Sequence, residues 1–81
     1  MTRKFSFSDL KMGMRARVLA VDCKVEGAER LMELGLTAGA IFEVIKVAPF
    51  GDPVEICLRG YRLCLRKDET KHVEIERLPD F

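Results

Sequence analysis

The segment 30–39, with the sequence RLMELGLTAG, constrains the fold more than any other part of the chain. Ala28, Leu31 and Met32 recur at i, i+3 and i+4, so their side chains share one face of a short helix. Gly35 ends this helix, because a residue without a Cβ adopts the left-handed conformation of the C′ position at no steric cost. The segment therefore predicts a short helix that packs one face against a core.

The residues that follow predict a tight corner leading into a strand. Leu36 would fold back onto Leu31, as in a Schellman motif. Gly39 stands at the position of a type II turn over 37–40 that requires a positive φ. The apolar run Ile41 to Val47 comes directly after the turn and predicts a strand.

The same pattern of a glycine turn followed by a strand occurs twice in the chain. The spacing Leu-x-x-Gly-x-x-x-x-Val is found over 10–18 and again over 36–44. In the first copy Gly13 is the turn glycine, and Arg15 to Val21 is the strand that follows it. Two copies of this length are too few for a solenoid, so we interpret them as repeated turn chemistry.

The rest of the chain predicts short elements separated by turns. Ser8 can cap one helical turn through Leu10, and a second helical turn fits Lys67 to Lys71. Two prolines make 49–53 a loop, whose Phe50 we expect to be exposed. Val73 and Ile75 alternate with glutamates in a closing strand.

A hairpin is predicted around Gly60, and the sequence suggests its register. With Gly60 and Tyr61 as the central residues of a II′ turn, the inward positions of both strands are apolar. We prefer this register to a turn at Arg59-Gly60. It pairs Arg59 with Arg62, Leu58 with Leu63, Cys57 with Cys64, Ile56 with Leu65, and Glu55 with Arg66.

Together these elements predict a mainly β fold, a small antiparallel SH3-like barrel of about five strands with one short inserted helix. With 81 residues, of which 48% are hydrophobic, we expect a single domain over 1–81 with an ordered core over about 7–76. There is neither an apolar run of roughly 18 residues nor a signal-peptide pattern. We therefore expect a cytoplasmic protein without direct membrane insertion.

Charge and aromatic content argue against nucleic-acid binding. Basic and acidic residues nearly balance, with a net charge of +1, and the chain has one tyrosine and no tryptophan. The arginines that could still form a basic patch are Arg15, Arg17, Arg62 and Arg66.

No combination of residues in the sequence indicates an enzyme, a cofactor or a standard metal site. The single histidine, His72, lacks the companions that catalysis or metal binding requires. In the preferred register Cys57 and Cys64 are directly opposed, so they could form a disulfide or, completed by Cys23 or a second molecule, share a soft metal. Packing as small apolar residues is the simpler interpretation.

The order of these motifs resembles the ferrous-iron transport protein A family, FeoA, from Phe7 to Ile75. Ala38 and Thr70 depart from it, at positions where the family often has proline and alanine. The motifs that carry the resemblance are Leu10-x-x-Gly13, the segment Arg30 to Gly39, Pro49-x-Gly51-Asp52-Pro53, and Arg59-Gly60-Tyr61-x-Leu63-x-Leu65-Arg66-x-x-Glu69.

The resemblance implies a cytosolic accessory protein of bacterial ferrous-iron uptake that binds the GTP-binding, cytosolic side of the FeoB transporter and modulates it. Two alternatives are a small metal carrier or regulator using Cys57, Cys64 or His72, and a module like the C-terminal domain of iron-dependent repressors. We expect docking at the end of the helix and the following turn, through Arg30, Leu34, Leu36, Thr37 and Ala38, with Gly35 and Gly39 maintaining the shape. Alternatively, Leu31, Leu34 and Leu36 all pack inward as core.

Overall fold

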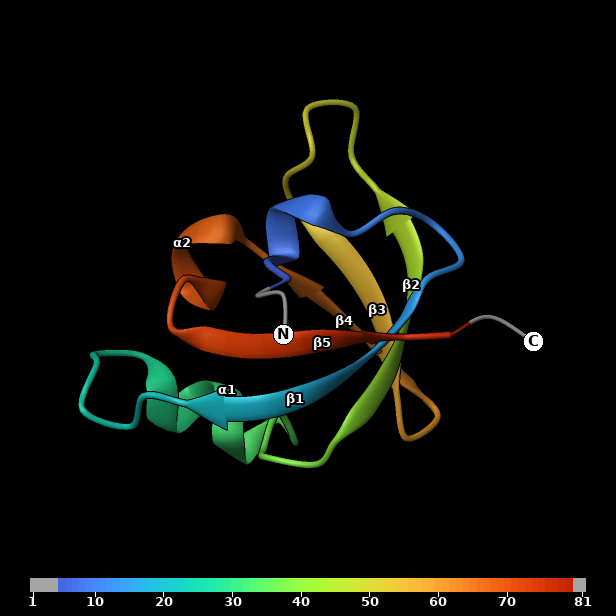
Figure 1. The fold of residues 1–81 in the computed structure, drawn as a ribbon. Helices are drawn as coiled ribbons and strands as arrows, with labels where there is room; N and C mark the ends of the chain where they lie inside the picture. The colour runs from blue at the N-terminus through green and yellow to red at the C-terminus, as the bar shows by residue number, and fades with distance from the viewer. Residues whose placement is uncertain (1–4, 80–81) are drawn as a thin grey trace.

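The computed structural model describes residues 5–79 and contains one antiparallel sheet with three short helical segments (Figure 1). The strand order is β4-β3-β2-β1-β5, and the sheet curves around a common core. Along the chain the elements are η1 (Phe7–Asp9), β1 (Arg15–Val21), α1 (Ala28–Glu33), β2 (Ile41–Val47), β3 (Val54–Leu58), β4 (Tyr61–Leu65), α2 (Lys67–Thr70) and β5 (Val73–Leu78). The predicted five-stranded, mainly β architecture with an inserted helix is confirmed.

The core is formed by the inward face of the sheet and by residues from the helical segments. Phe7 of η1 stacks on Phe42 of β2, with ring centroids 5.6 Å apart. The first helical segment begins two residues earlier than predicted, with Ser6 rather than Ser8 at its N-cap. The buried cluster comprises Phe7, Leu10, Ala16, Val18, Leu31, Leu36, Ala40, Phe42, Val44, Val54, Ile56, Leu58, Leu65, Val73 and Ile75.

The predicted corner after α1 is present. The N–H of Leu36 donates to the carbonyl of Leu31 and the N–H of Gly35 to that of Met32, both at 3.0 Å, which are the two hydrogen bonds of a Schellman motif. The turn that follows closes at 2.9 Å between Ala40 N and Thr37 O. The predicted helical stripe is wrong at one position, because Met32 is 39% exposed while the other two members are buried.

The two copies of the repeated motif are related by a local two-fold axis between β1 and β2. Gly13 N donates to Val44 O at 2.9 Å, and the equivalent Gly39 N donates to Val18 O at 2.7 Å. In return Val44 N donates to Met14 O, and Val18 N to Ala40 O, each at 2.8 Å. Each turn glycine is thus hydrogen-bonded to the strand that follows the other turn.

The same relation extends to the irregularities that bend the sheet. The β1–β5 register shifts between Val18 and Ala20, and the β2–β3 register shifts between Val44 and Lys46, which are the equivalent positions. Because a bulge bends its strand and increases the local twist, the sheet curves on both sides of the central pair.

The predicted register of the β3–β4 hairpin is wrong by two residues. Leu58 pairs with Tyr61, Ile56 with Leu63 and Val54 with Leu65, so the turn is Arg59-Gly60. Both turn residues have a positive φ, 51° for Arg59 and 86° for Gly60, as in a type I′ turn. A shift of two residues keeps every side chain on its predicted face, and for that reason alternation alone could not distinguish the two registers.

Replacing Arg59 by Asn should stabilise the protein. An ordinary side chain in the left-handed conformation costs roughly 1–2 kcal/mol, which Asn largely avoids, so we expect Arg59→Asn to raise the free energy of unfolding by about 0.5–1 kcal/mol. Urea denaturation measures this change. The matched control is Arg62→Asn, at an exposed strand position, where no gain is expected; an equal gain in both variants would contradict the turn assignment.

Gly35→Ala should be more destabilising than the same change at Gly27. Both glycines have a positive φ, 107° and 92°, but an added Cβ at Gly35 would lie 3.0 Å from Leu58 Cδ2 and from Tyr61 Oη, whereas nothing lies within 4 Å at Gly27. We expect a loss of about 1–2 kcal/mol at Gly27 from strain and about 1–3 kcal/mol more at Gly35 from crowding. Equal losses in denaturant titrations would show that crowding does not matter.

Candidate docking surface

The structure brings most of the predicted docking residues together on one corner at the end of α1. Arg30, Ala38 and Gly39 are exposed there, and Leu34, Gly35 and Thr37 are half-buried. The Arg30 side chain is 76% exposed and approaches Glu69 at 3.9 Å. This corner surface, as we call these six residues, combines a cationic side chain with small and apolar groups.

Leu36 does not belong to this surface. Its side chain is 0% exposed and is part of the core cluster, so it cannot contact a partner directly. The chain reversal of the Schellman motif turns Leu36 toward the core, where Leu31 of α1 is also buried. Leu34, in contrast, remains partly accessible.

The β3–β4 hairpin packs against the backbone of the corner surface. The Tyr61 hydroxyl, from the start of β4, donates to the carbonyl of Leu34, the last residue before the helix-ending glycine. Gly35 packs closely on Leu58 and Tyr61, because an added Cβ would lie only 3.0 Å from a side-chain atom of each. From the sequence Tyr61 was expected in the hairpin turn, so this hydrogen bond, which depends on the register of the hairpin, was not predicted.

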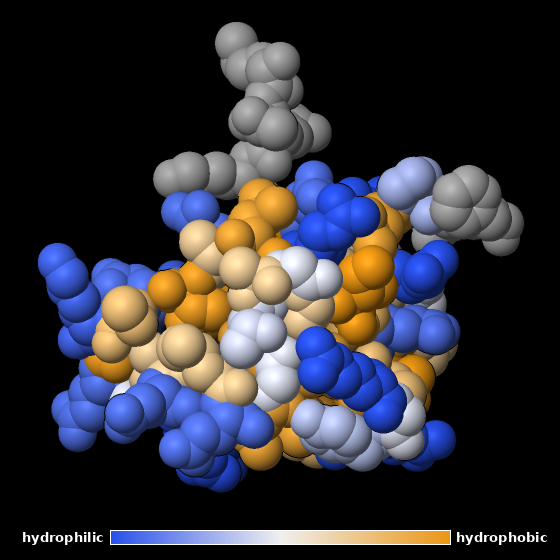
Figure 2. Space-filling view, turned by 90° about the horizontal axis from the view of Figure 1, so that it is seen from below, coloured by the Kyte–Doolittle hydropathy of each residue, from blue (hydrophilic) through white to orange (hydrophobic). Residues whose placement is uncertain are grey.

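The end of the molecule that carries the corner has an apolar centre and a hydrophilic margin. Figure 2, viewed from below, shows orange and pale residues over much of the centre, interrupted on one side by a blue side chain, with blue residues along the margin. Exposed apolar side chains next to the corner are Met32 before it and Ile41 after it, 39% and 42% exposed. A surface of this composition is typical of a protein-binding site.

The residues considered for metal binding are not brought together. Cys57 lies opposite Arg62, and Cys64 lies opposite Glu55, so the two thiols are not the directly opposed pair that we predicted. All three cysteines are free. Among residues 5–79, no three His, Cys, Asp or Glu side chains are arranged to hold a metal ion.

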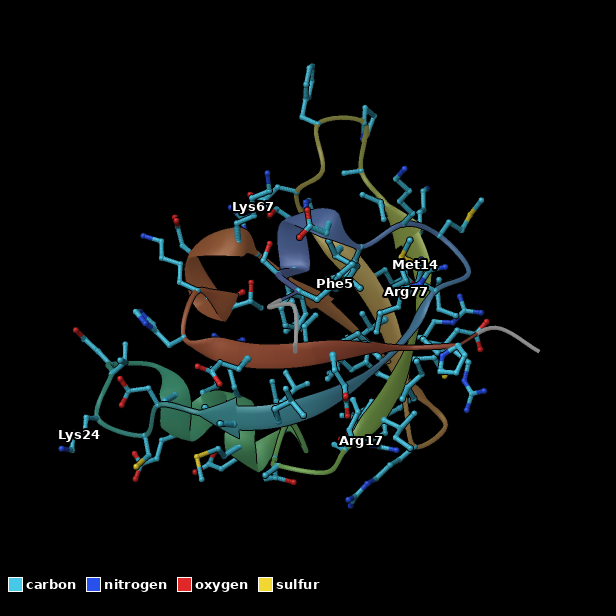
Figure 3. All side chains as sticks on the ribbon, viewed as in Figure 1. Phe5, Met14, Arg17, Lys24, Lys67 and Arg77 are labelled. Atoms are coloured by element: carbon cyan, nitrogen blue, oxygen red, sulfur yellow. The ribbon has the colours of Figure 1, made fainter. Side chains whose placement is uncertain are left out.

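The four arginines of the hypothetical basic patch do not form a free cationic surface. Arg17 binds Glu76 at 2.9 Å, and Arg62 lies 3.6 Å from Glu55. Figure 3 shows Arg17 below β1 in this view. Two of the four charges are therefore neutralised by carboxylates.

A groove of about 790 Å³ runs between η1, α2 and β5. Phe5 and Lys67, both labelled in Figure 3, are among its lining residues, together with Leu19, Val73 and Ile75. No buried side-chain N or O atom in the described part of the chain lacks a hydrogen-bond partner. The groove thus presents no unpaired buried polar group for a specific ligand.

Within the described range 5–79, the helices are all too short and too polar to cross a bilayer.

Comparison with known proteins identifies relatives along nearly the whole chain. The FeoA domain family matches residues 5–77. A curated relative, the fused Fe(2+) transport protein A/Fe(2+) transporter FeoB of Porphyromonas gingivalis, is 29% identical over 69 residues, which are 85% of this chain and 8% of that protein. The chain thus spans about 8% of the length of that relative.

Solved structures share the fold. A FeoA-like protein from Clostridium acetobutylicum superposes with a TM-score of 0.85 at 28% identity, over 100% of this chain and 94% of that one. Stenotrophomonas maltophilia FeoA complexed with zinc, a prokaryotic SH3 domain protein, gives a TM-score of 0.74 at 28% identity, over 89% of each chain. T. acidophilum IdeR, at 15% identity and a TM-score of 0.80 over 95% of this chain and 35% of that one, shares the fold alone. The chain therefore belongs to the FeoA domain family of ferrous-iron transport and has the family's SH3-like fold.

Proposed function

We propose that this protein is a cytoplasmic accessory protein of ferrous-iron uptake that binds the GTP-binding, cytosolic side of a FeoB transporter and modulates it. It acts by binding and not by catalysis. The observation that carries the proposal is the corner surface, an accessible small and apolar site that the fold holds rigid. The choice of partner is supported by the P. gingivalis relative, in which a FeoA part and a FeoB part are fused.

The rigidity of the corner favours binding. Two Schellman hydrogen bonds, the closed turn and the bond from Tyr61 to Leu34 hold the backbone of this segment. A partner that docks there does not have to order a flexible loop, so less conformational entropy is lost on association. The exposed Arg30 at the margin of the corner surface would complement an acidic group on the partner.

The test is a calorimetric titration of the protein into the cytosolic GTP-binding domain of the cognate FeoB transporter, with and without nucleotide. We expect saturable one-to-one binding. GTP hydrolysis, measured with and without the protein, then shows whether binding modulates the partner. Absence of binding to this domain and to the full-length transporter would overturn the proposal.

Ala38→Glu should weaken this binding at least tenfold without unfolding the protein. The residue is exposed on the corner surface, where a longer charged side chain would obstruct an apolar contact and leave a charge to be desolvated. The matched control is Ala38→Pro, which keeps a small apolar residue and suits the second position of a type II turn. We expect the control to bind with unchanged or slightly higher affinity; equal weakening in both variants would argue against a specific role for this surface.

A further inference from the structure

Phe50 is the most exposed large hydrophobic residue in the described part of the chain. It is 93% exposed, whereas Tyr61 and Ile41 are 42% exposed. The residue lies in the loop 48–53 between β2 and β3, which projects at the end of the molecule opposite α1 in Figure 1. The fold does not use this ring for packing, so its presence requires another explanation.

The loop that carries Phe50 is held in one shape. Gly51 N donates to Ala48 O at 2.7 Å, which closes a turn with proline at its second position. Ala48 N donates to Pro53 O at 3.1 Å, which ties the two ends of the loop together.

A second element fixes the loop from the side. The backbone N–H of Lys67, at the start of α2, donates to Asp52 Oδ1 at 2.9 Å. The side chain of Lys67 also passes the loop, with its Nζ 3.5 Å from the Cβ position of Gly51, and Figure 3 shows this residue near the base of the loop. An exposed aromatic ring on a braced loop is preorganised for contact, because little further ordering is needed on binding.

We propose that Phe50 is an anchor that inserts into an apolar pocket on the transporter partner, as a second contact separate from the corner surface. This inference rests on the proposed function. Aromatic residues, Phe among them, are enriched at protein interfaces, and binding hot spots lie in well-packed pockets near the centre of a contact. With the corner surface at one end of the barrel and Phe50 at the other, the protein would contact two separate parts of the transporter (Figure 1).

The charges around the loop favour a protein pocket over a lipid surface. Within the loop and its flanking residues, 46–53, the charges are one lysine, Lys46, and one aspartate, Asp52, so this segment has no net positive charge to attract anionic lipid. One ring without such attraction binds a bilayer weakly, since even a single acyl chain gives only marginal membrane binding. A pocket with protein walls surrounds the ring on several sides and buries more of it.

The test compares the unmodified protein with Phe50→Ala and Phe50→Leu, titrated into full-length cognate transporter in detergent. The matched control is Met12→Ala, another exposed apolar turn residue, which is 73% exposed. We expect Phe50→Ala to weaken binding by about tenfold or more and Phe50→Leu to weaken it less, because leucine keeps part of the apolar volume. The control should bind like the unmodified protein, and all four proteins should unfold at the same denaturant concentration because the ring is not packed.

The outcomes separate this inference from the proposed function. If the unmodified protein and Phe50→Ala bind equally, the anchor is refuted while the proposed function stands. If the unmodified protein does not bind the transporter, both are refuted. Phe50-dependent sedimentation with phosphatidylglycerol vesicles, or Phe50-dependent self-association, would assign the ring to a membrane or to a second copy of the chain and would also overturn the inference.

Discussion

The reciprocal hydrogen bonding of two glycine corners is the constraint on which the rest of the structure depends. Gly13 and Gly39 each direct the chain into a central strand, and each donates its N–H to the strand that follows the other glycine. A change in either corner would therefore disturb the alignment of both strands. Because β5 pairs with β1 and β3 pairs with β2, the positions of the outer strands follow from this central pair.

The corner after α1 also links the fold to the proposed docking site. The same turn that aligns β2 places Ala38 on the surface and Leu36 in the core. The corner surface is thus a direct product of the backbone geometry that builds the barrel. A small domain needs most of its residues to form the core. A binding site made of turn backbone and small side chains does not require an additional helix or strand.

At the opposite end of the barrel the backbone is also held in one shape, there by a side-chain hydrogen bond. There the loop that carries Phe50 is braced by Asp52, which accepts a hydrogen bond from the start of α2. The short helix α2 therefore stabilises a loop distant from it in sequence. Both ends of the molecule present accessible groups on rigid backbone, which suits a protein whose proposed role is to bind a larger partner.

Local patterns were sufficient to predict most elements and the family. The strands Arg15–Val21 and Ile41–Val47 were predicted with the bounds that the structure has, because a turn glycine marks the start of each. The Schellman motif was predictable because its hydrogen bonds lie within six consecutive residues. The repeated spacing indicated a shared turn, although its two-fold relation is visible only when the strands are paired.

The sequence by itself determined the elements, the inward faces of the last three strands and the positions of the turns to within two residues. Only the tertiary structure decided the hairpin register, since Arg59 accepts an unfavourable φ in an arrangement that pairs Leu58 with Tyr61 and brings the Tyr61 hydroxyl to Leu34. It also decided that Leu36 is buried, Met32 is exposed and the two cysteines are not opposed. These outcomes depend on contacts between segments far apart in the chain, which local periodicity does not encode.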